Sequence, residues 1–350
     1  MNKIIIFIAL LTVVLVPLFT GINATGQQPD YVNGSVSNAT GLSENDSFAN
    51  IEATYNISSI SATGFIPNDQ YMTLQWALES IGISALWSLT TGNSDIIVAI
   101  LDTGIDKYHQ DLSGQVIAEA NFTTSDTASD INGHGTHIAG IIAGKSNGLG
   151  IIGIAPDIKL LNVKVADDRG RCQAQDLAGG IIWAVDMGAD VINISIQIKE
   201  PSLELEEAIN YAWNNGAVIV AAAGNNGGQS AVYPAAYQNV IAVSATNESG
   251  DLAPLSNYGD WVDIAAPGYR IYSSLPGDEY GYETGTSFAT GYISAIAALL
   301  MDITVDSNGN GKINDEIASL IESGYIETGD SRINGGIINA ESILALITNT

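Results

Sequence analysis

Four polar residues of this chain stand beside apolar segments, in a way that could bring their side chains to one site. Asp102 ends an apolar run, His134 lies between two glycines, Asn225 follows a run of small residues, and Ser287 opens an apolar stretch of helical length. A serine, a histidine and a carboxylate can supply the nucleophile, the general base and the orienting group of an acyl transfer. A nearby asparagine amide could donate a hydrogen bond to the oxyanion of that reaction.

Each of these motifs has a second interpretation. The Asp-Thr-Gly motif at 102–104 is also the signature of aspartic proteases, but those enzymes need two such carboxylates and the chain has one such motif. His134 and His137 lie one helical turn apart and could bind zinc, although the usual His-Glu-x-x-His pattern is absent. Ser287 could simply cap a helix. The order Asp, His, Asn, Ser along one chain favours nucleophilic catalysis.

The elements that must position these residues alternate between strand-length and helix-length segments. The predicted strands are Ile96–Leu101, Ile158–Val165, Asp190–Ser195, Ala217–Ala222, Val240–Ser244 and Val262–Ala265, and the predicted helices are Gln173–Met187, Leu203–Asn215 and Ser287–Met301. Continuously apolar strands rich in Val and Ile are typical of a sheet that is covered on both faces. We therefore predict a three-layer α/β/α fold with a central, mostly parallel sheet and a site at the carboxyl ends of its strands.

In this order and setting, the motifs resemble those of the subtilisin-like serine proteases, particularly the thermitase-like branch. The resemblance spans about residues 67–345 and includes Asp-Val-Ile-Asn-Ile-Ser at 190–195 and Ala-Ala-Pro-Gly at 265–268. It implies the subtilisin-like fold and a serine endopeptidase that acts on protein or peptide substrates.

The resemblance also assigns roles to individual residues. It makes Ser287 the nucleophile, His134 the general base and Asp102 the group that orients the imidazole. Asn225 and the backbone N–H of Ser287 would form the oxyanion hole, and His137 would be structural. The residues that it assigns to substrate binding are Ser195, Ile196, Gln197, Ala222, Ala223 and Gly224. The apolar character of these two segments implies cleavage after apolar or uncharged residues.

The chain departs from the family pattern at a few positions around these motifs. Phe288, Gly291 and Tyr292 stand where the family carries Met, Pro and His, and Gln197 replaces a glycine, which implies a narrower cleft. These departures leave two alternatives open: a catalytically weak or inactive surface binding protein, and an enzyme that transfers the acyl group to amines. The presence of all four catalytic residue types favours the peptidase.

Two segments are candidates for calcium binding. The segment 306–314 follows the D-x-[DN]-x-[DN]-G start of a calcium loop, with ligands expected at Asp306, Asn308, Asn310 and Lys312. Its twelfth position, where a glutamate is expected, is Ile317, and a plain Asn-Gly turn is the alternative. The second site comes only from the resemblance, which assigns its ligands to Asp69 or Gln70, Asp111, Lys145, Asn147, Leu149 and Ile151.

Composition excludes several function classes. The chain has 350 residues, 46% of them hydrophobic, with 38 acidic against 11 basic residues and a formal net charge of −27. A disordered chain is excluded by the apolar content, and a binder of nucleic acid phosphates by the shortage of basic residues. Cys172 is the only cysteine, so no intrachain disulfide can form. We expect bound calcium to stabilise the loops instead.

The N-terminal part differs in composition from the remainder. Lys3 precedes an almost entirely apolar stretch that ends near Phe19, so we predict a secretory signal peptide at 1–24 and a secreted protein, with an uncleaved anchor as the alternative. The Asn-, Ser- and Thr-rich residues 25–64 are predicted to form a linker or a short pro-segment. Residues 65–350 would form the peptidase domain, with the calcium loop at 306–316. We expect a monomer without other membrane contacts.

Overall fold

A nine-stranded sheet runs through the part of the chain that the computed structural model describes, residues 64–349. The strand order is β10-β11-β7-β6-β5-β4-β1-β3-β2. All neighbouring pairs are parallel except β10 and β11. The strands are β1 Ile97–Asp102, β2 Val116–Asn121, β3 Lys159–Lys164, β4 Val191–Ile194, β5 Val218–Ala222, β6 Ile241–Thr246, β7 Ile264–Pro267, β10 Tyr325–Ile326 and β11 Ile337–Ile338. This confirms the predicted, mostly parallel sheet.

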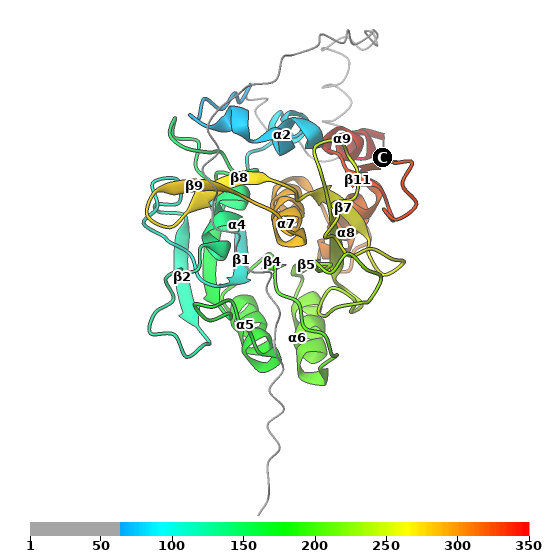
Figure 1. The fold of residues 1–350 in the computed structure, drawn as a ribbon. Coiled ribbons are helices and arrows are strands. Elements are labelled where there is room, and N and C mark those ends of the chain that lie inside the picture. Colours follow the sequence, from blue (N-terminus) through cyan, green and yellow to red (C-terminus); the bar gives the residue numbers. More distant parts are fainter. Residues whose placement is uncertain (1–63, 350) are drawn as a thin grey trace, which may run out of the picture.

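Helices cover both faces of the sheet and complete the predicted three layers (Figure 1). One face carries α5 (Ala174–Asp186) and α6 (Leu203–Asn214), and the other carries α4 (His134–Ala143) and α7 (Thr286–Ile303). Each face has its own cluster of buried apolar side chains. The remaining helices are η2 Met72–Leu74, α2 Trp76–Ile81, α3 Ser84–Trp87, α8 Asn314–Ser323 and α9 Ala340–Asn349. The predicted signal peptide, and the predicted linker apart from Gly64, lie outside the described residues.

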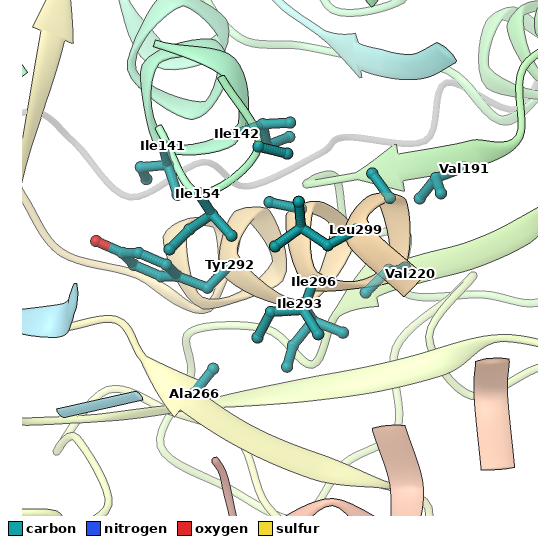
Figure 2. Packing of buried hydrophobic residues seen from close by; sticks show 14 of the residues in the cluster. Ile141, Ile142, Ile154, Val191, Val220, Ala266, Tyr292, Ile293, Ile296 and Leu299 are labelled. Carbon is teal, nitrogen blue, oxygen red and sulfur yellow. The ribbon is translucent and has the colours of Figure 1, made fainter. Parts of the chain in front are cut away.

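Helix α7 forms the centre of the larger core. All of its residues except Asp302 are buried, and its side chains meet those of α4 and of strands β4 and β5 (Figure 2). It is the one described helix long and apolar enough to cross a membrane, but nearly all of it is enclosed by this fold. Its apolar residues therefore serve packing, which fixes the helix that begins with the predicted nucleophile segment.

The two unusual residues after the predicted nucleophile take part in this packing. A methyl group added at Gly291 would lie 3.3 Å from Ile141 Cγ2, so the glycine lets α7 lie close to α4. The Tyr292 side chain is fully buried beside Ile154 (Figure 2). The proline and histidine of the family pattern are thus replaced by residues that fit the packing around α7.

A two-stranded hairpin lies over α4, away from the main sheet (Figure 1). It consists of β8 (Ile271–Leu275) and β9 (Glu279–Glu283). Two buried hydroxyls of β8 bind the helix backbone: Ser273 Oγ donates to the His137 carbonyl at 2.8 Å, and Ser274 Oγ donates to the Thr136 carbonyl at 2.9 Å. These bonds fix α4 in place from the side opposite the sheet.

Candidate active site

The carboxylate and the imidazole predicted to act together are in contact. Asp102 is the last residue of β1 and is fully buried, and its Oδ1 lies 2.7 Å from His134 Nδ1. A Cβ at Gly135 would lie 2.1 Å from the Gly104 carbonyl oxygen, so only glycine lets the start of α4 come this close to the turn after β1. Two local features, a strand end and a glycine-flanked helix start, therefore build the Asp–His pair.

Three acidic residues raise the pKa of the His134 imidazole. Burial alone would lower the pKa of His134, but the Asp102 carboxylate beside it and the charges of Asp130 and Glu283 outweigh that effect and raise the pKa. No described residue donates a hydrogen bond to the buried Oδ2 of Asp102. A negatively charged surrounding of this kind stabilises an imidazolium, as a general base requires after it has accepted a proton.

Asp130 is a functional candidate that the sequence analysis missed. It is buried, and its carboxylate accepts five hydrogen bonds: Oδ1 from Thr103 Oγ1 and the N–H groups of Asn132 and Gly133, and Oδ2 from the N–H and hydroxyl of Thr136. It therefore joins the turn after Asp102 to the first turn of α4. Asp130 lies four residues before the first residue of α4, and the N-cap position is occupied by Gly133, so no local capping signal marks Asp130 in the sequence.

The predicted nucleophile occupies the second position of α7. Ser287 is 3% exposed, and its Oγ lies 3.4 Å from the Ser195 carbonyl oxygen, to which it donates. The Ser195 hydroxyl donates in turn to the Ser287 carbonyl at 3.1 Å. No hydrogen bond joins Ser287 to His134 among the described residues, whereas the ring of the next residue, Phe288, lies 5.4 Å from the imidazole. The start of α7 thus adjoins the Asp–His pair.

Asn225 follows β5 and is bound to the same helix start. Its Oδ1 accepts hydrogen bonds from the N–H of Thr286 at 2.9 Å and from its hydroxyl at 3.1 Å. Because Oδ1 is occupied in this way, the amide group available for a ligand is Nδ2, which donates to no described residue. An amide held with its donor available, next to Ser287, is the arrangement expected for stabilising an oxyanion.

The two predicted substrate segments lie at the carboxyl ends of neighbouring strands. Ser195, Ile196 and Gln197 follow β4, while Ala222 ends β5 and is followed by Ala223 and Gly224. Both segments are bound to the start of α7: the first through Ser195, and the second because Gly224 N–H donates to Thr286 Oγ1 at 3.1 Å. The structure therefore brings together all the residues predicted for catalysis and substrate binding.

His137 has the surroundings of a structural residue. It is completely buried, its Nε2 lies 3.2 Å from the Gly281 carbonyl oxygen, and its ring lies 4.6 Å from that of Phe288. Burial lowers the pKa of His137 to about 3, so the imidazole is neutral. Within residues 64–349, no group of three or more His, Cys, Asp or Glu side chains could hold a metal ion, so the geometry does not favour the zinc alternative.

Two of the acids that the resemblance assigns to a calcium site lie against the loop 145–151. Asp69 and Asp111 are buried and converge on the loop 145–151: Asp69 Oδ1 accepts the N–H of Asn147 at 2.9 Å, and Asp111 Oδ2 accepts the N–H of Ile151 at 2.9 Å. The N–H of Lys145 donates to the Asp111 carbonyl. Neither carboxylate forms an ion pair with a described basic side chain. Two buried carboxylates without a cationic partner fit a bound Ca²⁺.

Two details of this loop differ from the expected ligand set. Gln70 is exposed, so of the two alternatives near the domain start it is Asp69 that lies against the loop. Asn147 presents its Nδ2 to Asp111 Oδ1 at 3.2 Å, while its Oδ1 accepts the N–H of Leu149. To act as a ligand, this amide would have to turn so that its oxygen faces the ion.

The segment 306–316 forms a loop that is held by hydrogen bonds among its own residues, with Asp315 at their centre. Asp306 accepts the N–H groups of two glycines, and the side-chain amides of Asn308 and Asn310 both donate to Asp315 Oδ2, at 2.8 and 3.0 Å. Ile317 is fully buried in the core, so the twelfth position faces away from the loop. The sequence analysis did not include Asp315 among the ligands. The Lys312 Nζ contacts the Asn214 carbonyl.

A three-layer α/β fold with an Asp–His pair beside a serine at a helix start is an arrangement found in serine hydrolases. The model of the Subtilase family matches residues 93–322, and this chain belongs to that family. It is 43% identical over 259 residues to "Thermophilic serine proteinase" from Bacillus sp. (strain AK1), covering 73% of this chain and 63% of that relative. It therefore spans less than two thirds of that relative's length.

Two further relatives match over most of their own length. The chain is 42% identical over 239 residues to "Thermitase" from Thermoactinomyces vulgaris, which covers 67% of this chain and 85% of that protein. It is 36% identical over 272 residues to "Subtilisin BL" from Lederbergia lenta, which covers 77% of this chain and 98% of that protein. These relatives support the predicted resemblance to the thermitase-like branch.

Proposed function

We propose that this chain is a serine endopeptidase in which Ser287, His134 and Asp102 carry out the reaction. The observation that carries the proposal is the 2.7 Å contact between Asp102 and His134. This pair lies next to the start of α7, where Ser287 is located. The Ser287 hydroxyl would turn from the Ser195 carbonyl toward His134 Nε2 when substrate binds. Hydrogen bonds of this kind often tighten only in the complex with substrate.

In the first half-reaction, Ser287 Oγ attacks the carbonyl carbon of the scissile bond, and His134 Nε2 accepts the hydroxyl proton. Asn225 Nδ2 and the N–H of Ser287 stabilise the oxyanion. His134 then gives its proton to the leaving amine as the carbon–nitrogen bond breaks, which leaves an acyl-enzyme. In the second half-reaction, water attacks the acyl carbon, again through His134, and releases Ser287. Asp102 keeps the imidazole oriented throughout.

The experiment that tests this proposal compares cleavage of a fluorescently labelled protein by the purified enzyme and by Ser287→Ala. The variant should lose nearly all turnover and keep its melting temperature, because the hydroxyl makes only one long hydrogen bond. Ser319→Ala, an exposed serine on α8, is the matched control and should keep full activity. Equal turnover by the Ser287→Ala variant would exclude Ser287 as the nucleophile.

We also propose that calcium stabilises the fold and that the protein is secreted. Calcium binding is supported by the buried carboxylates of Asp69 and Asp111, which form no ion pair with a described basic side chain, and more weakly by the loop 306–316. When bound, the ion supplies positive charge that these carboxylates lack, and it takes no part in the reaction. Secretion is supported by the apolar stretch near the N-terminus. Cleavage after uncharged residues is supported by the apolar residues of the substrate segments.

A further inference from the structure

The space between the two substrate segments, here called the gap, lies next to the start of α7, to which both segments are bound. β4 and β5 are parallel neighbours, so the segments that follow them leave the same edge of the sheet together. Ser287 is bound to the first segment and its neighbour Thr286 to the second, because Ser287 Oγ donates to the Ser195 carbonyl and Gly224 N–H donates to Thr286 Oγ1. A peptide carbonyl carbon bound at Ser287 Oγ would lie next to this gap, and we take the side chain of the residue on the acyl side of that carbonyl to enter it.

The side chain of Gln197 reaches across the gap. A Cβ added to Gly224 would lie 2.5 Å from Gln197 Oε1, and 2.7 Å from Asn257 Nδ2. The Gln197 amide oxygen is therefore in contact with the backbone of the opposite segment. Gly224 has a φ of +98°, a conformation that favours glycine, so the opposite segment has no side chain of its own here. Gln197 thus supplies the atoms that fill the space between the segments.

The backbone on both sides of the gap is firmly held. Ile196 and Ile198 are each 1% exposed, and Ile198 exchanges two backbone hydrogen bonds with Tyr233, of 2.7 and 2.8 Å. On the other side, Asn257 Nδ2 donates to the Ala223 carbonyl at 2.8 Å. The segments therefore cannot separate easily, and a substrate side chain can gain room only by displacing the Gln197 side chain.

We propose that Gln197 limits the acyl-side pocket to small residues, so that the enzyme cleaves after Gly, Ala or Ser in preference to Leu or Phe. This inference rests on the proposed peptidase function and narrows its substrate class. A large side chain would have to push the glutamine amide out of its contact with Gly224, and overfilling a well-packed site is costly. Hydrophobic pockets discriminate by about 10–200-fold per methylene, so the preference should be easily measured.

The test measures kcat/KM on four succinyl-Ala-Ala-Pro-X p-nitroanilides, in which X is Gly, Ala, Leu or Phe. The unmodified enzyme should prefer Ala over Phe at least tenfold. Gln197→Ala removes the amide and should shift the ratio of kcat/KM for the Phe substrate to that for the Ala substrate at least tenfold toward Phe. Gln238→Ala, an exposed glutamine between β5 and β6, is the control and should leave the ratio unchanged. Melting temperatures check that each variant is folded.

Two results would overturn the inference: a preference of the unmodified enzyme for Phe, or an Ala-to-Phe ratio that is unchanged in folded Gln197→Ala. A second measurement applies even if no substrate is cleaved. On a Ser287→Ala background, binding of acetyl-Ala-Ala-Pro-Ala amide and acetyl-Ala-Ala-Pro-Phe amide is compared by calorimetry, with and without Gln197→Ala. A tenfold shift of the Kd ratio toward Phe supports the inference, and an unchanged ratio contradicts it. Loss of the proposed function shows separately, as failure of Ser287 to react with a fluorophosphonate.

Discussion

The substitution Asp130→Asn tests how the Asp–His pair is positioned. It keeps the shape of a buried side chain that accepts five hydrogen bonds, but it removes the charge and replaces one oxygen by an N–H donor. If the new amide nitrogen takes the place of Oδ2, the Thr136 hydroxyl can reverse and accept, but the Thr136 N–H is left facing another donor. Hydrogen bonds to charged groups contribute about 1.5–3 kcal/mol, and a buried donor without a partner costs about 1–3 kcal/mol.

We therefore expect Asp130→Asn to lower the free energy of unfolding by about 2–4 kcal/mol and the melting temperature by about 5–10 °C. The same change should alter the pH dependence. The negative charges of Asp102, Asp130 and Glu283 raise the pKa of His134 against the effect of burial, so loss of one charge lowers that pKa. Since the neutral imidazole is the base, the acid limb of kcat/KM should move to lower pH.

The assay combines thermal unfolding with kcat/KM measured across the acid limb on a small, uncharged peptide substrate. Asp126→Asn is the matched control, because Asp126 lies on the same loop and is exposed. It should change neither the melting temperature nor the position of the limb. A variant Asp130→Asn as stable as the unmodified protein, or an acid limb displaced to higher pH, would refute the reasoning.

Three further predictions follow from the same structure. Asn225→Ala should lower kcat by about 10²–10³ with little change in KM, and an effect confined to KM would argue against an oxyanion role. Calcium at a hundredfold excess over Kd should stabilise the protein by about 2.7 kcal/mol, and Asp111→Ala should reduce that gain more than Asp306→Ala; a melting temperature insensitive to chelator contradicts both sites. Gly135→Ala places a methyl group against the Gly104 carbonyl, so it should lower both the melting temperature and kcat/KM; unchanged values would show that the contact is not tight.

The sequence predicted the sheet well because its strands are continuously apolar. The observed strands β1, β3, β4, β5, β6 and β7 lie within two residues of the predicted ranges. The hairpin of β8 and β9 was not predicted, since its Ser, Gly, Tyr and Glu residues give no apolar run, and it is stabilised by contacts with α4 that are distant in the sequence.

Side-chain contacts between distant segments were predicted only where a motif marked them. The residues of the Asp–His pair could be chosen because each stands in a distinctive motif. The contact of Gln197 with Gly224 depends on the register of two strands, and that of Asn310 with Asp315 depends on where α8 begins. Neither contact can be predicted from the local composition of the sequence. Asp130 was missed for the same reason, because its hydrogen bond with Thr103 joins segments that are distant in the sequence.

The central claim, that Ser287 is a nucleophile activated by His134, is tested most directly by reaction with a fluorophosphonate followed by mass spectrometric mapping of the labelled residue. We predict a single labelled site at Ser287, with much slower labelling of His134→Ala and none of Ser287→Ala. Labelling of a different serine, or labelling of Ser287 at the same rate in His134→Ala, would contradict the account.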